Sequence, residues 1–262
     1  MTSITVAETP LLLHALRLAD GALVHGHRLS EWTGRAPMLE EELALANVAL
    51  DLIGQARSLY QHAAALEGRG RTEDDLAYLR DAPDYRNPLL VELPNGDFAH
   101  AMLRLLFHAA FLHPFWRAQA GGGGAALAEP TLAAIAAKAE KEAAYHLRHA
   151  GEWVIRLGDG TAESRRRCLA ALDALWPYTG ELFEADAADR ELVAAGLVPD
   201  PAAIRPEWDA TLARVFDEAA LPLPDPGVPM RRGGRRGAHT EHLGPMLTTM
   251  QQLRRAHPGA TW

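Results

Sequence analysis

Cysteine is almost missing from this chain of 262 residues, which contains only Cys168. A single thiol cannot build an intramolecular disulfide framework, and it also excludes a zinc site made of several cysteine ligands. A chain that needs no disulfide suits a reducing compartment. We therefore expect a cytoplasmic protein.

Long apolar runs are missing as well. No stretch approaches the about 18 uncharged apolar residues of a membrane span, and the amino-terminal MTSITVAETPLLLHALRLAD lacks the basic segment of a secretory signal. Basic residues are outnumbered, with 26 Lys and Arg against 34 Asp and Glu, which gives a net charge of -8. Neither a membrane nor nucleic acid is therefore expected as a partner.

Alternation of apolar and polar residues, which would indicate strands, is absent, and helical periodicity takes its place. Apolar residues recur at helical spacing in four long segments, 10–32, 38–66, 98–120 and 130–157. Shorter helices are expected at 72–80, 164–192, 206–219 and 240–257. This pattern predicts an all-α protein, a four-helix bundle with extra carboxyl-terminal helices, as a single domain over residues 1–262.

Two features mark the ends of the third long helix. Asp97 stands where the N-cap is expected, three residues before His100, so this pair is interpreted as a cap and not as a pair of metal ligands. The run Gly121–Gly124 ends the helix. Because neither Lys-Ser nor Lys-Thr follows it, we expect a flexible connector and not a phosphate-binding loop.

The fourth long helix contains KAEKEAAYHLRHAGEW, in which Glu142, His146 and His149 share one face. A carboxylate-bridged di-iron centre needs one Glu from each of two helices and a Glu-x-x-His pair from each of the other two. His146 is one residue late for such a pair. On the second helix, Asp51 is followed three residues later by Gly54, which has no side chain to bind a metal, and the third helix contains no acid. We therefore predict a degenerate site that holds no metal.

Five collinear segments make the sequence resemble the C subunits of bacterial phenylacetyl-CoA epoxidase complexes. The resemblance extends over about residues 16–262. The five segments are LRLADGALVHGHRLSEW, ELALANVALDLIGQAR, LVELPNGDFAHAMLR, KEAAYHLRHAGEW and AHTEHLGPMLTTMQQL.

This resemblance implies a ferritin-like fold and a structural, non-catalytic subunit. In such complexes a homologous A subunit keeps the di-iron centre and epoxidises the ring of phenylacetyl-CoA, while a reductase subunit delivers electrons from NADPH. The C subunit stabilises the A subunit and helps to form the acyl-CoA site, and further small subunits take part. We therefore expect no cofactor in this chain, iron in the A subunit and NADPH at the reductase.

Two polar segments are candidates for contacts, the first from the resemblance and the second from its four arginines within six positions of an acidic chain. The loop between the second and third long helices lies near the acyl-CoA site in the family, so substrate contacts are expected from Asp84, Tyr85, Arg86 and Asn87. Guanidinium groups bind phosphates and carboxylates bidentately. A contact with coenzyme A or with acids of a partner is therefore expected from Arg231, Arg232, Arg235 and Arg236.

Two other functions stay open at this point. The chain could itself be an atypical metal oxidase that uses Glu142, His146 and His149, together with Asp51 or Glu241. It could also be a free-standing module that binds acyl-CoA. An oxidase would lose activity when His146 is replaced, whereas a binding module would bind CoA esters without any partner.

Overall fold

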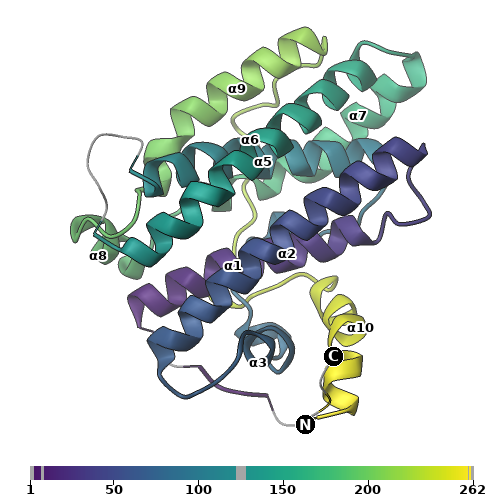
Figure 1. Cartoon of the computed structure of the whole chain (residues 1–262). Helices are drawn as coiled ribbons and strands as arrows, with labels where there is room; N and C mark the ends of the chain where they lie inside the picture. The colour runs from purple at the N-terminus through teal and green to yellow at the C-terminus, as the bar shows by residue number, and fades with distance from the viewer. Residues whose placement is uncertain (1–2, 7–8, 122–127, 259, 261–262) are drawn as a thin grey trace.

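The fold is a helical bundle, given by a computed structural model that describes residues 3–6, 9–121, 128–258 and 260 (Figure 1). Its four long helices are α1 (Pro10–Ser30), α2 (Leu39–Glu67), α5 (Phe98–Gln119) and α6 (Pro130–Gly158). No strand occurs within those described ranges. The all-α prediction is therefore confirmed. The predicted connector at Gly122–Gly124 lies outside the described residues.

Shorter helices complete the structure. They are α3 (Glu73–Tyr78), α4 (Leu89–Glu92), α7 (Ala162–Leu175), α8 (Ala187–Ala194), α9 (Arg205–Glu218) and α10 (Leu243–Ala256), with 3-10 turns at Ala82–Asp84, Trp176–Tyr178, Gly180–Phe183, Pro201–Ile204 and Gly234–Arg236. The prediction of one helix over 164–192 is wrong, because α7 ends at Leu175 and two of these turns separate it from α8. Pro177 explains the break, since it has no N–H for the hydrogen bonds of the helix.

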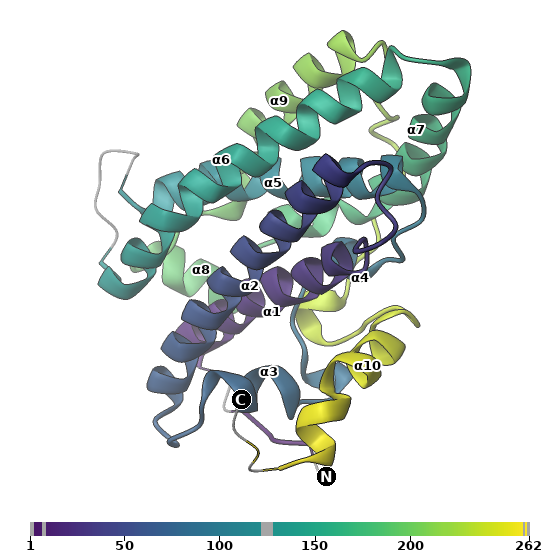
Figure 2. The same ribbon diagram turned by 45° about the vertical axis from the view of Figure 1, so that its right-hand side comes forward.

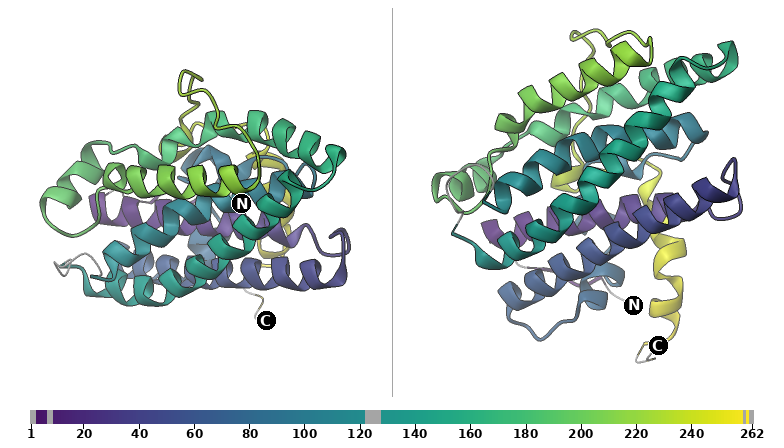
Figure 3. Two further views of the ribbon diagram at one scale, coloured as in Figure 1. Left: turned by 90° about the horizontal axis from the view of Figure 1, so that it is seen from above. Right: turned by 45° about the horizontal axis from the view of Figure 1, so that its top comes forward.

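The long helices pack as two pairs, α1 along α2 and α5 along α6, and α2 also faces α6 (Figure 3). Residues 68–97, which contain α3 and α4, form one long crossover between the pairs. A four-helix bundle with a single long crossover is the topology of the ferritin-like fold. The ferritin-like prediction is therefore confirmed, and α7, α8, α9 and α10 are additions to the bundle.

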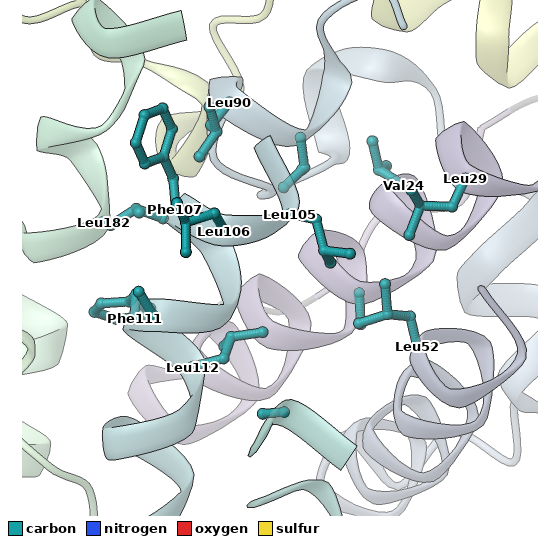
Figure 4. Packing of buried hydrophobic residues seen from close by; sticks show 14 of the residues in the cluster. Val24, Leu29, Leu52, Leu90, Leu105, Leu106, Phe107, Phe111, Leu112 and Leu182 are labelled. Atoms are coloured by element: carbon teal, nitrogen blue, oxygen red, sulfur yellow. The ribbon is translucent and has the colours of Figure 1, made fainter. Parts of the chain in front are cut away.

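The core lies mainly around α5. Leu105 of α5 points toward Val24 of α1 and Leu52 of α2, whereas Phe107 lies on the side of α5 near Leu182 (Figure 4). On that side α7 and α9 cover α5, and Trp208 of α9 donates its indole N–H to the Phe107 carbonyl over 2.9 Å. Because α5 is enclosed by helices all round, it needs no polar face.

The carboxyl-terminal helix α10 lies beside α3 (Figure 2). Gln251 of α10 donates to the Arg80 carbonyl over 2.9 Å, and Arg254 lies 3.2 Å from Asp75 of α3. At the start of α5 the predicted cap is confirmed, since the Asp97 side chain accepts from the His100 backbone N–H over 3.1 Å. Among the described residues, no helix combines the length and the apolar character that crossing a membrane requires.

Candidate functional site

A row of polar residues connects α2 and α6 in the position where a ferritin-like bundle would bind metal. We call this row the polar ladder. Its members face one another across the two helices and are half-buried or buried, unlike the solvated residues on the outer face of α6. They are Glu41, Asp51 and Gln55 of α2 and Glu142, His146 and His149 of α6.

The ladder is made of three cross-helix pairs. Gln55 Nε2 donates to Glu142 Oε2 over 2.9 Å, and His146 Nε2 lies 3.0 Å from Asp51 Oδ2. His149 Nε2 lies 3.1 Å from Glu41 Oε2. As the residue number rises along α6, the number of the partner on α2 falls, which is the order expected for antiparallel helices. Each carboxylate of the ladder is therefore already engaged by a neighbouring side chain.

Two further histidines lie across the bundle from the ladder. The Nδ1 atoms of His25 on α1 and His108 on α5 are 2.9 Å apart, so one ring donates to the other. Burial lowers the pKa of His108 to about 3, with His146 and Arg104 acting in the same direction. Burial also holds the pKa of His25 well below its ordinary value. Both imidazoles are therefore neutral, and neither carries the negative charge that a bridging ligand must supply.

These residues do not fit a di-iron centre. Such a centre needs carboxylates directed together at two metals, and the ladder directs each of its carboxylates at a different partner. A Cβ added at Gly54 would meet no atom within 4 Å, and the neighbouring Gln55 occupies the interior position instead. Within the part of the chain that the structure describes, no cluster of three or more His, Cys, Asp or Glu side chains could hold a metal ion.

The predicted contact loop is anchored largely in the interior. Tyr85 and Asn87 have no exposed surface. The Tyr85 hydroxyl donates to the Ala77 carbonyl, and Asn87 Nδ2 donates to Glu92 over 2.8 Å. Asp84 and Arg86 are half-buried. Substrate contact by this loop stays a prediction, and in this conformation only Asp84 and Arg86 could make it with their side chains.

The four arginines of the predicted cluster contact other residues of the same chain. Arg232 and Arg236 lie 2.8 and 3.6 Å from Glu184, and the guanidinium of Arg235 lies 3.0 Å from Asp189. The fourth member, Arg231, lies over the Tyr178 ring at 5.9 Å. Each of the four arginines therefore has an internal contact. Their contact with coenzyme A or a partner stays a prediction.

Sequence reasoning missed Glu41, Gln55 and the pairing of His25 with His108. The signal for the first two was present, because Glu41, Leu45, Val48, Leu52 and Gln55 recur at the three- and four-residue spacing of one helix face. Nothing local pairs His25 with His108, which are 83 residues apart.

A second buried polar group, also missed, connects α4 to the segment before α10. The fully buried Glu92 accepts from the Thr240 N–H over 2.6 Å and lies 2.7 Å from His239 Nδ1. His239 Nε2 is 3.0 Å from the Tyr85 carbonyl. Burial opposes the charged form of His239, but the hydrogen bond and charge of Glu92 outweigh it and raise the pKa of the imidazole.

We expect the stability difference between the wild type and His239→Gln to depend on pH. Folding raises the pKa of His239. The charged imidazole therefore contributes fully to the free energy of unfolding at pH values below its ordinary pKa near 6.5, and this contribution is lost as the pH rises through the pKa of the folded state. The cost should be about 1.5–3 kcal/mol at pH 5.5, the range for hydrogen bonds to a charged group, and smaller at pH 9. Urea unfolding across this range measures it. His242→Gln, beside the exposed Glu241, is the control, and a cost of His239→Gln independent of pH would contradict the assignment.

Comparison with known proteins agrees with this architecture. The sequence profile described as phenylacetic acid catabolic protein matches residues 1–262. The chain is 46% identical over 256 residues to the C subunit of the 1,2-phenylacetyl-CoA epoxidase of Escherichia coli (strain K12), and the match covers 96% of this chain and 99% of that protein. The chain therefore belongs to the phenylacetic acid catabolic protein family.

Proposed function

We propose that this chain is a non-catalytic structural subunit of a cytoplasmic, multicomponent monooxygenase that epoxidises the ring of phenylacetyl-CoA in phenylacetate catabolism. It pairs with a homologous di-iron subunit and stabilises it. The iron belongs to that partner, and NADPH enters through a reductase subunit. The observation that carries the proposal is the polar ladder, whose carboxylates pair with side chains where a catalytic bundle would direct them at iron.

The ladder also weighs against an oxidase within this chain. A metal would have to separate His146 from Asp51 and Gln55 from Glu142, and it would still lack a bridging carboxylate from α5. The neutral His25 and His108 offer nitrogen ligands only. The hydrogen-bonded pairs of Gln55 with Glu142 and of His146 with Asp51 give these two carboxylates partners without a metal.

An exposed apolar stripe on α2 supports association with a partner. Leu39, Leu43 and Leu50 are exposed to 68, 59 and 65% and lie within a narrow sector of one helix face. Large exposed apolar side chains in a row are uncommon on a monomer, and obligate interfaces are large and apolar. We expect this stripe to form part of the contact with the di-iron subunit.

Metal content and co-purification test the proposal. The chain purified alone and untagged from iron-replete cells should contain almost no iron, whereas about two irons per chain would mean that it holds a bundle site of its own. Co-expression with the di-iron subunit should give a stoichiometric complex. A chain that stays separate from that subunit would contradict the pairing.

Matched variants separate the structural role from a catalytic one. Leu43→Glu with Leu50→Glu should abolish the complex, while Leu253→Glu, a 54% exposed leucine on α10, should leave it intact. His146→Ala should alter the stability of the chain and retain most of the turnover of the assembled complex. Assembly with loss of turnover in His146→Ala would instead assign chemistry to the ladder.

A further inference from the structure

Gly54 lies in the middle of α2, where glycine is less favourable than alanine and needs a structural reason. The three other glycines inside the long helices have such a reason. A Cβ added at Gly21, Gly26 or Gly151 would lie 3.4, 3.1 or 3.6 Å from a neighbouring part of the chain. A Cβ added at Gly54 would meet no atom of the described chain within 4 Å. Packing within the chain therefore does not explain Gly54.

Gly54 lines a groove between α2 and α6, which run side by side (Figure 2). The groove offers about 270 Å³, compared with the about 150 Å³ of a closed cavity that holds benzene. Its surface is mainly apolar, with Ile135 and Ala139 of α6 among the walls, and the ladder pair of Gln55 and Glu142 also lines it. The groove therefore has room for one large apolar side chain.

The exposed leucines of α2 lead to this groove. Leu39, Leu43 and Leu50 are the exposed stripe described above. At 100° per residue, all three lie within about 60° of Gly54 around the helix axis. A ridge of side chains followed by a gap on one face is the shape that a neighbouring helix fits, because helices pack ridges into grooves. A helix that covers the leucines can therefore also enter the groove.

The charges beside the groove indicate what kind of helix fits. Lys138 and Lys141, the only lysines of this acidic chain, are exposed on α6, and Arg148 follows on the same side of the helix. Lys138 lies 3.2 Å from Glu142. Within the described ranges, neither Lys141 nor Arg148 has an ion pair. Complementary charges then require acidic side chains on the helix that docks here.

We propose that a helix of the di-iron subunit packs across α2 and α6, inserts an apolar side chain into the groove at Gly54 and places acidic side chains near Lys141 and Arg148. Glycine permits the close approach of the two helices, which a larger residue would prevent. This inference rests on the proposed function, because it takes the di-iron subunit as the partner, and it identifies the position where the two chains approach most closely.

Gly54→Ala tests the proposal, because the stability of the chain and its affinity for the partner should change in opposite directions. The variant alone should melt about 1–4 °C higher, since alanine favours the helix and its Cβ has free space. Its Kd for the di-iron subunit, measured by titration calorimetry with both full-length chains, should rise at least about fivefold, because overpacking of a close contact is unfavourable. Gly151→Ala is the matched control. Its Cβ would lie 3.6 Å from Val215 of this chain, so the Kd should stay unchanged.

Two further variants test the groove and the charges separately. Gly54→Leu fills the groove and should abolish binding. Lys141→Glu should raise the Kd about threefold or more at low salt, and less at about 1 M salt, where charges are screened within about 3 Å. Arg214→Glu, an equal change of charge at an exposed site on α9, should change the Kd less than twofold. Circular dichroism verifies that each variant is folded, and Gly54→Ala decides the matter if Gly54→Leu is not.

The outcomes distinguish this inference from the proposed function. A wild-type chain that does not bind the di-iron subunit would contradict both. Wild-type binding that Gly54→Ala leaves unchanged would overturn this inference alone, and Gly54 would then only mark the position of a lost metal ligand. Equal Kd values for Lys141→Glu and the wild type at low salt would overturn the acidic character of the docking helix.

Discussion

Asp20→Asn is expected to lower the free energy of unfolding by about 3–5 kcal/mol, the cost of removing one partner from a buried ion pair. Asp20 and Arg80 are both fully buried, and the guanidinium of Arg80 donates to both carboxylate oxygens. The same carboxylate accepts from the Tyr60 hydroxyl over 2.5 Å and from the Arg86 N–H over 2.7 Å. An amide would leave the charge of Arg80 unbalanced in the interior.

Urea unfolding of purified variants measures this cost. Asp81→Asn is the control, because Asp81 pairs with Arg255 over 2.9 Å at the surface, where such a pair contributes at most about 1 kcal/mol. Asp20→Leu combined with Arg80→Met removes both charges and should recover part of the loss. A cost below about 1 kcal/mol for Asp20→Asn would mean that Arg80 finds water or another acceptor, which contradicts the enclosed arrangement.

The same carboxylate explains why helices were easier to predict than contacts. Helical periodicity is local, so the segment 38–66 was predicted within one residue of the observed α2, Leu39–Glu67. Asp20 and Arg80 are 60 residues apart. Their pairing depends on how the crossover packs beside α1, and no pattern within either segment contains that information.

The contact loop shows a second limit of sequence reasoning. Residues 81–97 are rich in Pro, Asn and Asp, a composition that favours irregular structure, but the segment also contains the 3-10 turn Ala82–Asp84 and the short helix α4. Composition does not tell whether a loop is covered by another part of the chain. Here Gln251 of α10 reaches the Tyr85 hydroxyl at 3.3 Å, and His239 reaches the Tyr85 carbonyl, so the loop is largely interior.

The predicted metal-site positions show a third limit, one of spacing along a helix. Helical geometry places Glu142, His146 and His149 on one face of α6, and His146 lies in the interior with 2% exposure. On α2 the expected ligand position was Gly54, three residues after Asp51, whereas the interior residue is Gln55, four residues after it. With 3.6 residues per turn both spacings lie near one face, and only packing against α6 selects between them.

Glu181→Ala is expected to release the arginine segment and to cost at least about 3 kcal/mol. The fully buried carboxylate of Glu181 accepts from three backbone N–H groups, those of Leu89, Gly233 and Arg235, over 2.8, 2.9 and 3.1 Å. It thereby joins α4 to the 3-10 turn at Gly234–Arg236. Each buried donor left without an acceptor costs about 1–3 kcal/mol, and alanine leaves three.

Limited trypsin digestion combined with urea unfolding tests this expectation, because Arg231, Arg232 and Arg236 give the protease cleavage sites within the released segment. Glu184→Ala is the matched control. Glu184 pairs with Arg232 and Arg236, whose side chains are 55 and 58% exposed, so its loss should cost less than about 1 kcal/mol and leave the backbone anchored. If both variants were cleaved equally fast, the surface pairs and not the Glu181 carboxylate would hold the segment.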